Sequence, residues 1–192
     1  ENIKSIGSHS FEQIGSGVGI DLILGSDTNI GSYAFAQARI KSIKLGDNTK
    51  VGDYAFNEIS TLARVIMPDA ATVTIGAYAF ANCYSLEAID LSKLVGTVGD
   101  YAFSGCGKIV FANLENVEHI GAYAFANCYG ITKISIPNVK TIADHAFTKL
   151  TDGAMAPQFT EIELPSTLTS IGAYAFAYAN KLTGIVIPKG RD

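Results

Sequence analysis

The sequence contains no tryptophan and only three cysteines among its 192 residues. Three cysteines are too few for the disulfide framework that stabilises small secreted domains. No apolar run approaches the roughly 18 residues that a membrane-spanning helix needs. Lys and Arg number 14 against 18 Asp and Glu, so the chain lacks the basic excess of a nucleic-acid-binding protein. These absences argue against a disulfide scaffold, a membrane span in this segment and a nucleic-acid partner.

A repeated phrase dominates what the sequence does contain. Residues 75–84 and 120–129 both read IGAYAFANCY. If the phenylalanine of this phrase is taken as an anchor, eight copies occur, at Phe11, Phe35, Phe56, Phe80, Phe103, Phe125, Phe147 and Phe176. Neighbouring anchors are 21 to 24 residues apart, except for 29 before the last, where residues 148–158 carry an insertion. A period near 23 residues lies in the range of leucine-rich repeats.

Each copy predicts two elements. After the anchor, apolar residues return in the pattern L-x-x-I-x-I, as at Leu86, Ile89 and Leu91. The alternation predicts a short strand with one buried face. The phrase itself predicts a glycine turn and then one short helical or 3-10 turn, with alanine and phenylalanine facing inward. A unit of this size cannot bury its own apolar face, so we expect the copies to stack into a solenoid.

The consensus IGxYAFxxCxxLxxIxIP resembles the BspA-like leucine-rich repeat family of bacterial surface proteins, over essentially the whole chain. The resemblance implies an α/β solenoid, a right-handed superhelical arc of about eight repeats that forms a single domain over residues 1–192. It further implies an extracellular or cell-surface location and adhesion to host proteins, matrix proteins included, or to proteins of neighbouring cells. Residues 1–7 resemble residues 115–121, and neither end has the polar capping repeat of a solenoid. We therefore expect a segment of a longer surface protein.

The exposed side chains of the predicted strands, on the concave face of the arc, are the candidate partner-binding surface, because the concave face is the usual recognition surface of such arcs. These residues vary from copy to copy, whereas the core positions stay apolar. The candidates are Lys44, Arg64, Ile66, Glu87, Asp90, Val110, Phe111, Lys133, Glu161 and Glu163. Ile66, Val110 and Phe111 are either an apolar partner patch or ordinary scattered surface residues. Glu161 and Glu163 suggest acid–base chemistry, but solvated carboxylates are the stronger interpretation.

A column of tyrosines precedes the anchors by two residues, and Tyr78, Tyr101 and Tyr123 are its candidate binding members. Tyrosine suits a half-exposed surface, since its ring is apolar and its tip is polar. The column is either a packing ladder over the turns or a binding stripe for protein or sugar.

The cysteines and histidines give little support to a catalytic or metal-binding site. Cys83, Cys106 and Cys128 each follow an anchor by three residues, but the other copies hold apolar residues there, so we interpret them as buried hydrophobes. His9 and His145 take the tyrosine position, and we place His119 in a turn. We expect no enzyme activity, no cofactor and no metal. A protein partner is the favoured function, and a structural stalk or a carbohydrate-binding surface are the alternatives.

Overall fold

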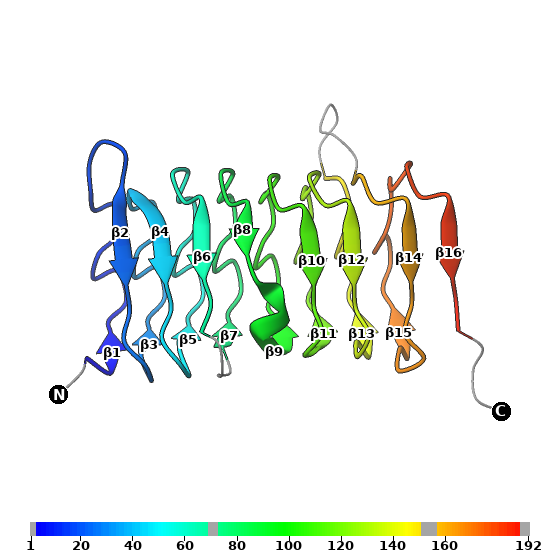
Figure 1. Cartoon of the computed structure of the whole chain (residues 1–192), viewed down its shortest axis with the longest axis horizontal. Helices are drawn as coiled ribbons and strands as arrows, with labels where there is room; N and C mark the ends of the chain where they lie inside the picture. The colour runs from blue at the N-terminus through cyan, green and yellow to red at the C-terminus, as the bar shows by residue number, and fades with distance from the viewer. Residues whose placement is uncertain (1–2, 69–72, 151–156, 189–192) are drawn as a thin grey trace.

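The computed structural model describes residues 3–68, 73–150 and 157–188, and it is a row of stacked coils (Figure 1). Each coil contributes two short strands, one to each of two faces. The even-numbered strands are those that the L-x-x-I-x-I pattern predicts: β2 (Ile20–Ile23), β4 (Ile40–Lys44), β6 (Arg64–Ile66), β8 (Ala88–Ile89), β10 (Phe111–Asn113), β12 (Lys133–Ser135), β14 (Glu161–Glu163) and β16 (Gly184–Val186). We call the solvent side of these strands the outer strand face.

The odd-numbered strands form a second parallel sheet, which the sequence analysis did not predict. They are β1 (Ser5–Ile6), β3 (Asn29–Ile30), β5 (Lys50–Val51), β7 (Val73–Ile75), β9 (Leu94–Val98), β11 (Val117–Ile120), β13 (Thr141–Ile142) and β15 (Ser170–Ile171). This sheet is continuous through all eight coils. Most of its strands are only two residues long, so an alternating pattern has no room to develop.

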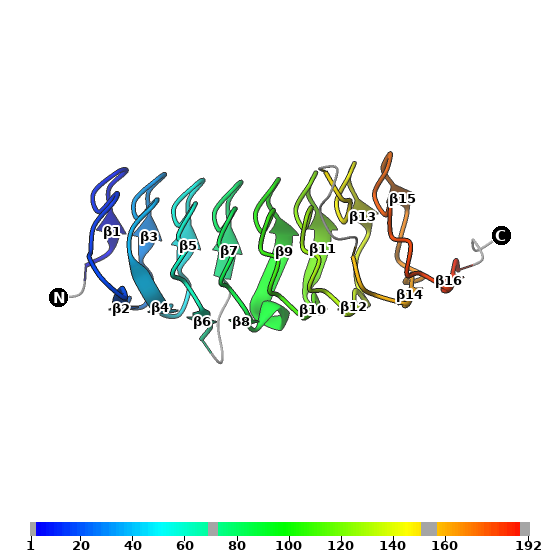
Figure 2. The same cartoon turned by 90° about the horizontal axis from the view of Figure 1, so that it is seen from above.

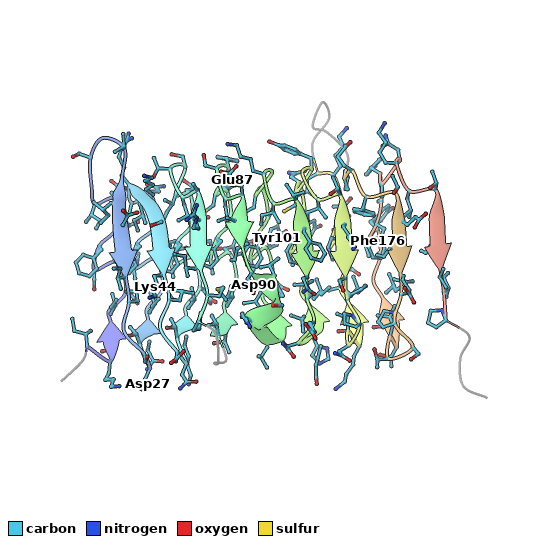
Figure 3. The ribbon with its side chains drawn as sticks, in the orientation of Figure 1. Asp27, Lys44, Glu87, Asp90, Tyr101 and Phe176 are labelled. Carbon is cyan, nitrogen blue, oxygen red and sulfur yellow. The ribbon has the colours of Figure 1, made fainter. Side chains whose placement is uncertain are left out.

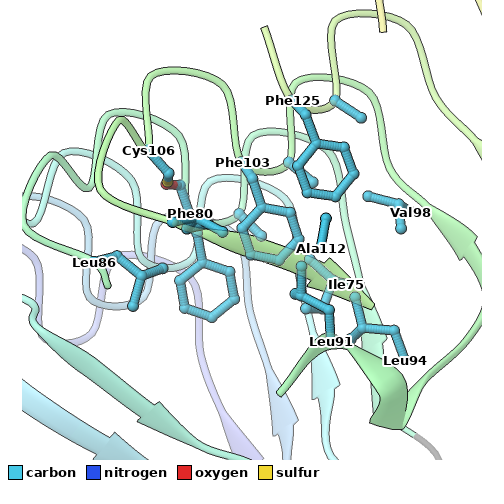
Figure 4. Close-up of a cluster of buried hydrophobic side chains, with 14 of the residues drawn as sticks. Ile75, Phe80, Leu86, Leu91, Leu94, Val98, Phe103, Cys106, Ala112 and Phe125 are labelled. Atoms are coloured by element: carbon cyan, nitrogen blue, oxygen red, sulfur yellow. The ribbon is translucent and has the colours of Figure 1, made fainter. Parts of the chain in front are cut away.

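The anchor phenylalanines lie in one row between the two faces, which is buried from Phe35 to Phe147 and more exposed at its ends, Phe11 and Phe176. Ring centroids of neighbouring anchors are 5.1 to 5.6 Å apart along the whole series from Phe11 to Phe176. Figure 4 shows three of them, Phe80, Phe103 and Phe125, among the aliphatic residues of the strands. The predicted continuous apolar interior is therefore confirmed.

The predicted helical turn after the glycine is wrong. The phrase of residues 76–83 is instead a run of overlapping β-turns, in which the N–H groups of Ala79, Ala81 and Cys83 donate to carbonyls three residues earlier. The alternate N–H groups, of Tyr78, Phe80 and Asn82, donate to the next coil at 2.7 to 2.8 Å. A helix would use all of these donors within one coil, whereas the turns leave every second one to join neighbours.

Left-handed backbone makes these turns possible. Tyr78 has a φ of 56° and Asn82 a φ of 59°; the equivalents of Tyr78 in the other coils repeat its value closely, and most equivalents of Asn82 do so as well. Such a backbone costs about 1–2 kcal/mol per non-glycine residue. Contacts between coils, described below for the tyrosines, offset this cost. In the described ranges the one helical element is the 3-10 helix η1 (Leu91–Lys93), which Asp90 caps.

The row of coils bends little in either view (Figures 1 and 2), whereas the family resemblance implied an arc. The sheet under the outer strand face is interrupted twice. Its paired strands are β2-β4-β6-β8, then β10-β12, then β14-β16. The first interruption lies where η1 follows β8, and the second follows the insertion at residues 148–158, of which 151–156 lie outside the described residues.

Candidate functional site

All ten candidate residues of the outer strand face are exposed, as predicted. On several strands they alternate with buried residues, such as Val65 between Arg64 and Ile66 or Ile162 between Glu161 and Glu163. Figure 3 shows Lys44, Glu87 and Asp90 on this side of the molecule. The alternation means that substitutions on this face change its chemistry without touching the core.

The strand register brings some candidates together. Arg64 and Ile66 pair with Ser42 and Lys44, which makes the early part of the face basic. Phe111 pairs with Lys133, whose Nζ lies 5.6 Å from the Phe111 ring centroid, a cation–π geometry. Glu161 and Glu163 make the late part acidic.

The proposed apolar patch of Ile66, Val110 and Phe111 is divided. Val110 and Phe111 are neighbours, 53% and 43% exposed. Ile66 is separated from this pair by the coil of β8. Val65 pairs with Ile89, so the register puts Asp90, and not Val110 or Phe111, next to Ile66. Strands β8 and β10 are not hydrogen-bonded to each other. The structure thus supports Val110 with Phe111 as one exposed apolar pair and Ile66 as a separate residue.

A groove of about 380 Å³ lies at the second interruption of the sheet. Its walls include Lys133 and Ile134 of β12 on one side and Glu163 and Pro165 on the other. The groove brings a basic and an acidic candidate to one place. Glu161 and Glu163 lie on the exposed side of β14, which is the arrangement of solvated carboxylates and not of an enclosed acid–base pair.

The tyrosine column is a continuous stack of eight rings. It runs His9–Tyr33–Tyr54–Tyr78–Tyr101–Tyr123–His145–Tyr174, with centroids 4.4 to 4.9 Å apart and planes within 13° of parallel. Burial of the ring and the neighbouring Tyr101 and Tyr54 raise the pKa of Tyr78 to about 12. Each inner ring has both faces covered by its neighbours, so only edges and hydroxyls meet solvent. This geometry favours the packing ladder.

The three cysteines are buried and free, which agrees with their interpretation as small hydrophobes. Each thiol donates to the carbonyl of an anchor phenylalanine in the preceding coil: Cys83 to Phe56 at 3.2 Å, Cys106 to Phe80 at 3.1 Å and Cys128 to Phe103 at 3.0 Å. Burial raises the pKa of Cys83 to about 12 and raises that of the other two thiols as well. Within the described residues, no group of three or more His, Cys, Asp or Glu residues is placed to hold a metal ion.

His119 lies in strand β11. The prediction from the sequence that it lies in a turn is therefore wrong. Its Nδ1 is 2.8 Å from Oγ1 of Thr141 in the next coil. Both residues belong to an exposed or half-exposed row on the eight-stranded sheet, which the sequence analysis missed. The row is Ser5, Asn29, Lys50, Thr74, Thr97, His119, Thr141 and Ser170. A signal was present, since a polar residue and then Val or Ile precede the glycine position in every copy.

Comparison with known proteins agrees with this fold. Residues 28–152 and 154–191 match a family model described as BspA type leucine rich repeat region, in six copies. A leucine rich cell surface protein from Faecalibacterium prausnitzii is similar in structure over 96% of this chain, with a TM-score of 0.64 and 23% identity. A leucine-rich repeat protein from Eubacterium ventriosum is similar over the same share, with a TM-score of 0.68 and 20% identity.

The chain spans about half the length of these two proteins, covering 48% of the first and 47% of the second. The comparison with curated proteins gives no match. Among the described residues, no helix has the length and apolar character to cross a membrane.

Proposed function

Because the chain belongs to the BspA-type leucine-rich repeat family, we propose that it is a non-catalytic protein-binding module of a bacterial cell-surface protein. Its partner is a protein of a host, such as a matrix protein, or a protein of a neighbouring cell. The outer strand face makes the contact. The cell-surface location rests on the family and on the surface protein that shares its fold.

One observation carries this proposal. The residues of the outer strand face differ from coil to coil, whereas the interior residues are nearly constant. At the same position of successive strands the residues are Arg64, Ala88, Phe111, Lys133 and Glu161, while the phenylalanine inside each coil does not change. A solenoid needs a constant interior to stack, but nothing in stacking requires a varied exterior. An exposed aromatic residue with charges around it is a common centre of a protein interface.

A structural stalk is the second candidate. The coil-to-coil hydrogen bonds and the two unbroken aromatic stacks make a stiff rod without reference to a partner. Carbohydrate binding along the tyrosines has less support, since sugars stack on open ring faces and the inner rings of this column have none.

The test is binding of the purified protein to host matrix proteins, surface proteins of neighbouring bacteria and a glycan array. A variant with Arg64→Glu and Phe111→Ser changes the outer strand face, and Lys50→Glu is a matched control on the eight-stranded sheet. We expect protein binding that the first variant loses and the control retains. Equal loss of binding in both variants would contradict binding through the outer strand face. No binding to any of these proteins or glycans would favour the stalk.

A second variant separates the carbohydrate alternative. Replacement of Tyr78, Tyr101 and Tyr123 by serine lowers stability if the column only packs. Loss of glycan binding at a temperature where this variant is still folded would instead support a binding stripe.

A further inference from the structure

Five consecutive tyrosines of the aromatic column lie face to face without an interruption. The centroids of the pairs Tyr33–Tyr54, Tyr54–Tyr78, Tyr78–Tyr101 and Tyr101–Tyr123 are 4.5, 4.5, 4.4 and 4.5 Å apart. Their ring planes are 5°, 5°, 7° and 13° from parallel. Members of a pair are 21 to 24 residues apart in sequence, so each contact joins two different coils.

The rings of this column are half-buried, and their edges reach the surface. The positions next to the phenolic hydroxyl are at these edges. A small oxidant or a surface-acting enzyme therefore has access to the hydroxyls, while the ring faces stay packed.

In the described part of the molecule several other easily oxidised side chains are absent or protected, although Tyr84 and Tyr178, outside the stack, are 55% and 66% exposed. The sequence has no tryptophan. The three thiols are buried, and burial raises their pKa values, which keeps them from forming the reactive thiolate. Met67 is buried as well. The tyrosine column thus combines partial exposure with direct contact between oxidisable rings.

We propose that neighbouring tyrosines of this column are a site of oxidative cross-linking, at which hydrogen peroxide and a haem peroxidase form dityrosine between adjacent coils. Each phenol of a pair loses one electron and one proton. The two radicals couple through a carbon–carbon bond between ring positions next to the hydroxyls. Those two carbons then lose their hydrogens as protons to solvent, and the two phenoxyl oxygens regain theirs.

The balance closes for each bond formed. Two ring C–H bonds are replaced by one C–C bond, and the pair loses two hydrogen atoms in total. One hydrogen peroxide molecule takes these two electrons and two protons and becomes two molecules of water. No other reductant or co-substrate enters.

Such a bond would fasten one coil to the next on the side of the turns. The coils already contact each other there through backbone hydrogen bonds, such as those from Tyr78 to Asp100 and from Tyr101 to Ala122, at 2.8 Å each. A covalent bond at the same place would keep the stack closed when these hydrogen bonds open. The proposal does not depend on the binding function, because a stalk would benefit equally.

The test treats dilute protein with a haem peroxidase and hydrogen peroxide, and then identifies cross-linked peptides by mass spectrometry. We expect monomeric product with dityrosine between column neighbours, such as Tyr54 with Tyr78, and a loss of two hydrogen masses per bond. The decisive variant is Tyr54→Phe with Tyr101→Phe. It keeps a ring at every position of the stack, but no two tyrosines remain adjacent, so the cross-link is lost.

The matched control is Tyr84→Phe with Tyr129→Phe, which removes two tyrosines outside the stack and keeps the cross-link. If the decisive variant does not fold, as circular dichroism would show, Tyr78→Phe alone must remove the two bonds at that position and leave Tyr33–Tyr54. The proposal is overturned by wild-type protein without intramolecular dityrosine, by bonds that involve mainly Tyr84 or Tyr129, or by undiminished dityrosine in the decisive variant.

Discussion

Oδ1 of Asp100 accepts a hydrogen bond from the backbone N–H of Ala122 in the next coil, at 2.8 Å. An aspartate that follows a glycine turn can accept from the N–H groups of its own turn, as a helix cap does. The structure shows the bond running between coils instead. Asp53 and Asp144 make the same bond to Ala77 and Ala173.

These bonds alternate along the chain. From residue 53 on, the position after the glycine holds Asp53, Ala77, Asp100, Ala122, Asp144 and Ala173. Each alanine coil supplies an N–H to the aspartate coil before it. The identical segments 75–84 and 120–129 are also two coils apart and not one. The alternating pair of coils, not the single coil, is therefore the unit that the sequence repeats most faithfully.

Removal of the Asp100 carboxylate leaves the Ala122 N–H without its acceptor. We expect Asp100→Ala to lower the free energy of unfolding by about 1–2 kcal/mol. Asp100→Asn keeps an acceptor oxygen and loses less. Urea denaturation of both variants measures the difference, and equal losses would show that the hydrogen bond is not the cause.

Gly121 is required by the same carboxylate. A Cβ built on Gly121 would lie 2.6 Å from Oδ1 of Asp100 and 2.7 Å from its backbone nitrogen. The position equivalent to Gly121 in the next coil is Ala143. The coil before it has Ala122, and therefore no carboxylate, where the coil before Gly121 has Asp100. We expect Ala143→Gly to lower the free energy of unfolding by at most about 1 kcal/mol, and Gly121→Ala to lower it by several times as much. Combination with Asp100→Ala relieves only part of the clash, because the backbone contact remains.

The sequence was sufficient for the solenoid, for most of the even-numbered strands and for the phenylalanine row, since the anchor recurs in eight copies and the L-x-x-I-x-I pattern in six of them. It was not sufficient for the turn after the glycine. Alanine and phenylalanine have ordinary helix-compatible side chains, and the φ of 56° at Tyr78 is imposed by hydrogen bonds to the neighbouring coil. Contacts between coils leave no recognisable pattern within a single copy. For the same reason the two-residue strands of the eight-stranded sheet were not predicted.

The candidate site was predicted as a list of exposed positions but not as an arrangement. Exposure of Phe111 and Lys133 follows from alternation within their strands, whereas the break between β8 and β10 that separates them from Ile66 depends on η1. The sequence of that coil, with Asp90 before Leu91, contains the cap that starts η1. Its effect on the neighbouring sheet can be seen only in three dimensions.

Two phenylalanines in one coil make a matched test of the core. Phe103 has no exposed surface, while Phe111 is 43% exposed on the outer strand face. We expect Phe103→Ala to cost about 3–5 kcal/mol, because it leaves a cavity in the row of rings. Phe111→Ala should cost less than about 1 kcal/mol. Chemical denaturation compares them, and similar losses would contradict the assignment of Phe111 to a free surface.

The buried thiols make stability fall in alkaline solution. Burial raises the pKa of Cys83 to about 12 from an unfolded value of 9.0, so the folded state holds its proton more tightly. The stabilisation is complete below the unfolded pKa and is lost as the pH rises from there through the folded pKa. At about pH 10 the buried Cys83 thiol should lower the free energy of unfolding by about 1 kcal/mol relative to about pH 7, and Cys106 and Cys128 should act in the same direction. Replacement of Cys83, Cys106 and Cys128 by alanine should remove this part of the pH dependence while lowering stability at neutral pH. A triple variant whose urea midpoint falls between these pH values as steeply as that of the wild type would show that other groups cause the loss.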